Sequence, residues 1–293
     1  MKITVKVLFA LVSTGAWLAA GVAQAQTPIA EFDFNTGDAS SLTSTNGQYT
    51  LTQDIGQNPF PGAISFSTSG DTITGFAGLS TTQINSTALP TTNGFSVFTR
   101  LILNSAPQAL GDGGLFGLFS GTVGTDSSVQ SYGQISMMGR NNGGLSPFAN
   151  STTTGGNPLG PFPGIAPSVG TPLDLTLVYN PSTATIGGTT YTTPTVTLYF
   201  GGNAPQVVSL PAGSTLSPFT TLDLGNIFGQ NFPVDGVTYQ DVQVFDQALT
   251  DTQVVGITIG ASVPEPSTWA LMISSLVLLV AFTRFRTGWL TER

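Results

Sequence analysis

The sequence predicts an all-β protein, an antiparallel β-sandwich or jelly roll, on three observations. β-branched and aromatic residues alternate with polar residues in many short runs. Glycine, proline and asparagine separate these runs, which is typical of strands joined by turns. No stretch between residues 26 and 262 keeps a helical period. Many short strands with turns between them favour two packed sheets.

Composition narrows the possible functions. The 293-residue chain has a formal net charge of −8, no cysteine and no histidine. Between residues 26 and 262 only Arg100 and Arg140 are basic, against Glu31 and a dozen aspartates. An acidic surface with so few cations repels phosphate backbones, so nucleic acid is excluded as a partner. The missing histidine also excludes a Ser–His–Asp triad and histidine-ligated metal sites.

Residues 1–25 have the features of a secretory signal peptide. Two lysines give a positive start, residues 7–20 are apolar, and Ala23 and Ala25 form a small-x-small cleavage site. Cleavage after Ala25 leaves Gln26 as the first residue of an exported domain that spans residues 26–262. A retained N-terminal helix is the alternative.

The alternating runs predict ten strands in this domain. We expect them at residues 29–34, 48–53, 63–67, 94–103, 114–120, 132–138, 173–180, 193–202, 206–210 and 236–246. In the last run the alternation slips at Gln240 and Asp241, which predicts a β-bulge that bends the strand.

Two further segments complete the domain. Residues 140–170 are rich in Gly, Pro, Asn and Thr, and we expect a long irregular loop because each proline removes a ladder donor. Such a loop either lines a binding surface or is a plain surface excursion. Thr250 and Gln253 have the spacing of a capping box, which predicts a short helix within residues 248–256 that stops at Gly256.

Three stretches together resemble the LamG-like, concanavalin A-like jelly-roll family. They are residues 30–53, residues 95–103 followed by 173–202, and the closing stretch "DGVTYQDVQVFDQALTDTQV" at 235–254. The resemblance implies a sandwich over residues 29–257 and carbohydrate binding as the family-level function.

The same resemblance implies a calcium site at the edge of the sandwich. Its candidate ligands are Asp33, Asp38, Asp235 and Asp241. Calcium prefers hard oxygen ligands such as carboxylates and carbonyls. The alternative is that these aspartates serve turns and caps, since Asp-Gly is a turn signal by itself.

We expect the domain not to be an enzyme. Glu31 and Asp33 alternate on one predicted strand, as the carboxylates of some concanavalin-like glycosidases do. Those enzymes need a second glutamate shortly afterwards, where this chain has Asn35 and Thr36. A divergent glycoside hydrolase is the alternative.

Aromatic side chains offer little for sugar stacking. The three tryptophans, at positions 17, 269 and 289, all lie outside the domain. Tyr132, Tyr191 and Tyr239 either stack on a sugar or pack as ordinary strand residues.

The C-terminal end begins with a stiff turn. Pro264, Glu265 and Pro266 cannot continue a strand or helix, because proline lacks an amide donor and favours extended backbone. Residues 267–283 carry no charge. As a helix they measure about 25 Å, a little short of a hydrocarbon core of about 30 Å.

A basic pair, Arg284 and Arg286, follows this apolar run. The positive-inside rule places both arginines in the cytoplasm and the domain outside, in agreement with the signal peptide. Pro-Glu-Pro, one apolar helix and a basic cluster, over residues 263–286, resemble the PEP-CTERM sorting signal, with residues 287–293 as a cytoplasmic tail. The resemblance implies processing by an exosortase in the inner membrane. An anchor that is never cut is the alternative.

The sequence therefore predicts an exported protein, held in the inner membrane before processing and then located at the cell surface or in the extracellular matrix. Its sandwich is expected to serve adhesion or to bind extracellular polysaccharide. A structural surface component without a discrete ligand is the remaining alternative.

Overall fold

The computed structural model describes residues 26–54, 62–75, 78–81, 91–105, 114–119, 135–139, 145–149, 167–216, 221–225 and 236–258. The β-domain is the compact unit Thr27–Asp251. The predicted signal peptide, residues 1–25, and the predicted sorting segment, residues 263–286, lie outside the described residues. No helix among the described residues is long and apolar enough to cross a membrane.

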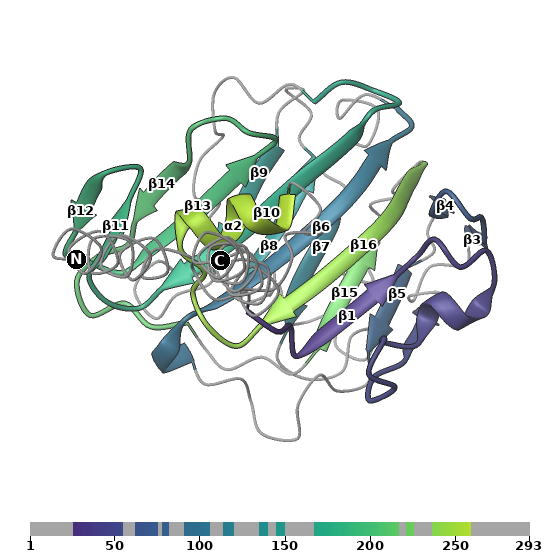
Figure 1. Ribbon diagram of the computed structural model, residues 1–293, viewed down its shortest axis with the longest axis horizontal. Helices are drawn as coiled ribbons and strands as arrows, with labels where there is room; N and C mark the ends of the chain where they lie inside the picture. Colours follow the sequence, from purple (N-terminus) through teal and green to yellow (C-terminus); the bar gives the residue numbers. More distant parts are fainter. Residues whose placement is uncertain are drawn as a thin grey trace, which may run out of the picture. The chain divides into compact units, whose positions relative to one another are not determined.

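The predicted fold class is confirmed, because two antiparallel sheets lie one in front of the other (Figure 1). The larger sheet has eight strands in the order β14-β13-β10-β6-β16-β4-β3, with β1 also paired to β16. These strands are β1 (Ala30–Asp33), β3 (Gly62–Ser65), β4 (Asp71–Gly75), β6 (Phe95–Leu103), β10 (Pro172–Asn180), β13 (Thr195–Phe200), β14 (Gln206–Ser209) and β16 (Val237–Phe245).

The second sheet has six strands in the order β2-β5-β15-β7-β8-β9. They are β2 (Leu51–Asp54), β5 (Gly78–Thr81), β7 (Gly114–Phe119), β8 (Ile135–Gly139), β9 (Leu145–Ala149) and β15 (Thr221–Gly225). The remaining elements are the hairpin β11 (Ala184–Ile186) and β12 (Thr189–Tyr191), the 3-10 turns η1 (Ala39–Leu42) and η2 (Thr91–Asn93), and the helix α2 (Asp251–Thr258).

The core lies between the two sheets and follows from the period of two. In β1, Ala30 and Phe32 are fully buried, whereas Asp33 is exposed. In the neighbouring strand β16, Val242 and Val244 are the buried partners of that same face. Burying apolar side chains on one face of each strand sends the alternate positions to the other face.

One hydrogen bond joins the two sheets through the core. The hydroxyl of Tyr239, on β16, donates to the carbonyl oxygen of Leu115, on β7. Both residues are fully buried, and the ring of Phe34 lies 6.0 Å from that of Tyr239, centroid to centroid. Tyr239 is therefore a core residue, and of its two alternatives the packed strand residue is the one observed.

Each of the ten predicted strands overlaps an observed one, and the bulge is confirmed. The pairing of β16 with β6 shifts register between Tyr239 and Asp241. Before the shift the other edge of β16 pairs with β4, and after it the same edge pairs with β1. The bulge thus lets one long strand bind two short ones in succession.

Two predictions about irregular segments are wrong in part. The predicted loop 140–170 contains the strand β9, which pairs with β8 at the end of the described six-stranded sheet. An edge strand tolerates a proline such as Pro147, because the proline nitrogen, which cannot donate, can face away from the neighbouring strand. The predicted helix is present as α2, but it passes through Gly256 and ends at Thr258. A glycine weakens a helix by about 1 kcal/mol and does not by itself end it.

Replacing Tyr239 by phenylalanine tests the inter-sheet hydrogen bond. We expect Tyr239→Phe to lower the free energy of unfolding by about 1–2 kcal/mol, because the buried carbonyl of Leu115 loses its donor. The measurement is urea denaturation of the full chain in detergent. Tyr191→Phe, at a half-buried position in β12, is the matched control, and an equal loss in both variants would contradict the assignment.

Candidate functional site

A polar pocket of about 490 Å³ lies on the outer face of the eight-stranded sheet, the face turned away from the core. We call it the face pocket. It is lined by Glu31, Asp33, Asn35, Thr45, Arg100, Gln240 and Asp241.

Strand pairing brings these side chains together from distant parts of the sequence. Asp33 of β1 lies opposite Asp241 of β16, and Asp241 lies opposite Arg100 of β6. Side chains at directly opposed positions share a face, with Cβ atoms about 4.5–5.5 Å apart. The apolar neighbours of these residues are in the core, so the charged side chains meet on the outer face.

Hydrogen bonds fix two of the carboxylates. The side-chain nitrogen Nδ2 of Asn35 donates to Oδ1 of Asp33 and to the backbone carbonyl oxygen of Gln240, each at 2.9 Å. The hydroxyl of Thr45 donates to Oε2 of Glu31 at 3.1 Å. These contacts attach the segment after β1 to the bulge in β16 and orient the carboxylates.

Asp241 has the most constrained environment in the face pocket. Its Oδ2 accepts a hydrogen bond of 2.8 Å from the amide of Gln243, whereas its Oδ1 is buried and has no hydrogen-bond partner. Burial is the main reason that the pKa of Asp241 is raised, to about 7. The bond from Gln243 opposes this rise, and the charges of Glu31 and Asp33 add to it.

Arg100, the only basic residue among the described residues that line the face pocket, is paired with a neighbouring carboxylate. Nε and Nη2 of Arg100 donate to the two carboxylate oxygens of Asp174 on β10, at 2.7 and 2.9 Å. This two-point pairing fixes the orientation of the guanidinium relative to Asp174. Arg100 therefore only partly offsets the three carboxylates, and the pocket is acidic.

The predicted calcium ligands are only partly brought together. Asp33 and Asp241 face each other in the face pocket. Asp38 does not line it but caps η1, accepting from the backbone amide of Ser40 at 2.8 Å. Asp235 lies outside the described residues. In the described part of the chain, no three acidic side chains are arranged to hold one metal ion.

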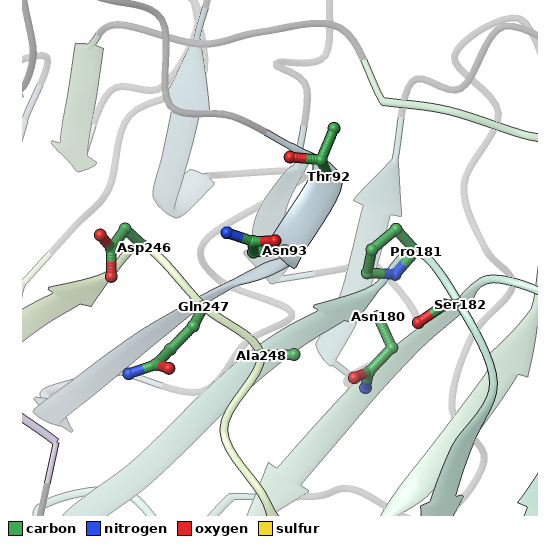
Figure 2. Close-up of a pocket in the computed structure, with 8 residues that line it drawn as sticks. All are labelled: Thr92, Asn93, Asn180, Pro181, Ser182, Asp246, Gln247 and Ala248. Carbon is green, nitrogen blue, oxygen red and sulfur yellow. The ribbon is translucent and has the colours of Figure 1, made fainter.

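A second pocket, of about 460 Å³, lies where β6 begins and where β10 and β16 end (Figure 2). We call it the rim pocket. Asn93 sits between two walls, with Asp246 and Gln247 on one side and Asn180 on the other. It is lined by Thr92, Asn93, Asn180, Pro181, Ser182, Asp246, Gln247 and Ala248. The sequence patterns did not indicate this pocket.

Of the other predicted residues, Tyr191 and Gln26 are described, and neither lines a pocket. Tyr191 is half-buried in β12, and Tyr132 lies outside the described residues. The sorting residues Pro264, Glu265 and Pro266, the arginines at 284 and 286, and the cleavage residues at 23 and 25 also lie outside them. Gln26 is described, in a stretch without regular structure that precedes β1.

No family model and no curated protein matches this chain. Solved structures do match. The binding domain of botulinum neurotoxin serotype D in complex with N-acetylneuraminic acid has 11% identity and a TM-score of 0.53, over 81% of this chain and 51% of that one. Domain 4 of the arabinanase AbnA from Geobacillus stearothermophilus, with arabinotriose, has 13% identity and a TM-score of 0.51, over 79% of this chain and 98% of that one.

A third match is the Trypanosoma rangeli sialidase, at 10% identity and a TM-score of 0.51, over 77% of this chain and 31% of that one. The chain thus spans about half the length of the toxin domain and a third of the sialidase. At these identities the likeness establishes the β-sandwich fold.

Replacing Asp241 by asparagine tests the buried carboxyl. The folded pKa of about 7 exceeds the unfolded value of 3.8, so the folded state binds the extra proton and stability falls as pH rises from about 4 to 7. Asparagine removes this loss. We therefore expect the free energy of unfolding of Asp241→Asn, relative to that of the native protein, to be higher at pH 8 than at pH 4, by at most about 4 kcal/mol.

Urea denaturation of the full chain at the two pH values measures this gain. Asp246→Asn, at an exposed position, is the control. The same pH dependence in both variants would show that burial does not hold the proton on Asp241.

Proposed function

We propose that the protein is an exported surface protein whose β-sandwich binds polysaccharide in the face pocket without cleaving it. The observation that carries the proposal is the pocket itself. Carboxylates, side-chain amides, a hydroxyl and a guanidinium converge there on paired strands, and these are the donors and acceptors that sugar hydroxyls need. Similar folds solved with N-acetylneuraminic acid and arabinotriose add support.

The charge of the face pocket narrows the ligand class. Glu31, Asp33 and Asp241 oppose one guanidinium that is already paired with Asp174. Like charges at close range weaken binding, so neutral or amine-bearing polysaccharides are favoured over anionic ones.

Binding of the full chain to immobilised polysaccharides tests the proposal. The chain is kept in a detergent without a sugar headgroup, and a panel of neutral polysaccharides is compared with alginate, which is anionic. We expect a neutral member to be bound and alginate not. Asp33→Asn should bind about tenfold more weakly, because a charged acceptor is lost.

Asn203→Ala is the control for that comparison. Asn203 is exposed in the turn after β13 and lines neither pocket. Equal binding by Asp33→Asn and Asn203→Ala, or binding to no polysaccharide at all, would contradict the proposal.

Glycoside hydrolysis is the competing function, and one observation favours it. Asp241, with a pKa raised to about 7, lies opposite Asp33, and a carboxyl group of raised pKa beside a second carboxyl group is what a glycosidase uses. The same incubations are therefore assayed for new reducing ends. We expect none. Reducing ends released by the native chain but not by Glu31→Gln would establish the hydrolase.

We also propose calcium as an accessory ligand of the face pocket. Asp33 and Asp241 would hold it, and the support is the buried Oδ1 of Asp241, which has no hydrogen-bond partner. Two carboxylates supply only part of the six to eight oxygens that calcium takes. The binding assay accordingly has arms with millimolar calcium and with EDTA, and equal binding in both would remove calcium from the proposal.

The sorting proposal concerns the two ends of the chain. We propose that the signal peptide is removed after Ala25 and that an exosortase cuts near Pro264–Pro266, which releases the domain to the cell surface or matrix. Mass spectrometry of the protein from the cell exterior should find Gln26 first and the apolar segment missing. Protein that still ends at Arg293 would favour the uncut anchor.

A further inference from the structure

The rim pocket has a rigid frame built by the buried Ser96 of β6. Its hydroxyl donates to the carbonyl oxygen of Gln247 at 3.0 Å and accepts from the backbone amide of Leu249 at 2.9 Å. The amide of Ala248 donates to the carbonyl oxygen of Asn93 at 3.2 Å. The segment after β16 is thereby fixed to both β6 and η2.

A close backbone approach also holds the walls of this pocket. Gly94 has φ +74° and lies so close to β10 that an added Cβ would stand 2.2 Å from the carbonyl oxygen of Tyr179. Glycine is therefore required where the two walls meet. A pocket whose walls are fixed beforehand loses little entropy when a ligand binds.

The lining groups are almost all neutral and polar. The side-chain amides of Asn93 and Asn180 offer both donors and acceptors, and the hydroxyls of Thr92 and Ser182 add to them. Among the lining residues that the structure describes, Asp246 is the only charged one. In the described part of the chain, no residue forms a hydrogen bond with the side chain of Asn93, Asn180 or Ser182. These groups are available to a ligand.

The lining residues that the structure describes disfavour two ligand classes. None of these described residues is basic, so none of them offsets the charge of an anion beside Asp246. None of them is aromatic either, so they offer a flat aromatic ligand no stacking partner. A volume of about 460 Å³ lies in the usual range for small-molecule sites, about 300–1,000 Å³.

From this geometry we propose that the rim pocket is a second saccharide site, separate from the face pocket, that takes one neutral sugar residue through its hydroxyl groups. A sugar hydroxyl can donate to the carboxylate of Asp246 while it accepts from a neighbouring amide. This inference rests on the proposed polysaccharide binding. The chain then has two sites for a single polymer, and so can bind more strongly than either site alone.

Calorimetric titration of the full chain with neutral oligosaccharides tests the inference. The probes are arabinotriose, maltotriose, cellotriose and mannotriose, with N-acetylneuraminic acid as the anionic comparison, in a detergent without a sugar headgroup. We expect two sites for at least one neutral probe. Asp246→Asn and Asn180→Ala should each weaken one site about tenfold or more, and Asn203→Ala should change neither.

The outcomes separate the two proposals. If Asp33→Asn weakens the one site found and the rim variants bind as the native chain does, the rim inference fails and the face proposal stands. If no probe binds and the immobilised polysaccharides do not bind either, both fail. If the rim variants lose binding and Asp33→Asn does not, the rim pocket is the principal site and the face proposal fails. The melting temperature of each variant shows whether a loss comes from unfolding.

Discussion

The structure depends on one constraint, that the inner face of the eight-stranded sheet must be apolar. β1 and β16 satisfy it with Phe32, Val242 and Val244, all fully buried. Because side chains alternate, Glu31, Asp33 and Asp241 are then forced onto the outer face. A hydrophobic requirement on one face thus concentrates negative charge on the other. The bulge at Gln240 completes the arrangement by moving the partner of β16 from β4 to β1.

This concentration of negative charge destabilises the folded protein, and such a local destabilisation is typical of a functional site. A carboxylate oxygen of Asp241 is buried without a donor, next to two other carboxylates. Local conflicts of this kind occur most often at functional sites, where a ligand makes the missing contacts. The rim pocket differs from the face pocket, because its amides and hydroxyls are neutral and do not repel one another. Hydrogen bonds such as that of Ser96 hold its backbone in place. The two pockets would therefore differ in pH dependence, with the face pocket responding near neutrality.

The sequence predicts the fold well where alternation is strong and poorly where composition is polar. β6, β10 and β16 carry long apolar alternation and lie where it predicts. β4, with the sequence Asp-Thr-Ile-Thr-Gly, offers one large apolar side chain, and β9 contains a proline, so neither shows a strand signal. Both are strands because neighbours supply the ladder. Tertiary pairing overrides weak local preference in such cases.

The same limit applies to the sites. Asp33 and Asp241 were found through a family resemblance, but Arg100 and Thr45 join them only through strand pairing and a turn. The rim pocket joins three segments of the chain, residues 92–93, 180–182 and 246–248, which are separated by 87 and 64 positions. No local motif marks it, because its residues are ordinary turn residues until the strands end beside one another.

Polysaccharide binding in the face pocket can be tested by carbodiimide labelling of carboxyl groups, read by mass spectrometry with and without a bound neutral polysaccharide. We expect the polysaccharide to protect Glu31 and Asp33 from labelling and to leave the labelling of Asp38, which lines neither pocket, unchanged. Unchanged labelling at Glu31 and Asp33 while the polysaccharide is bound would contradict binding in the face pocket.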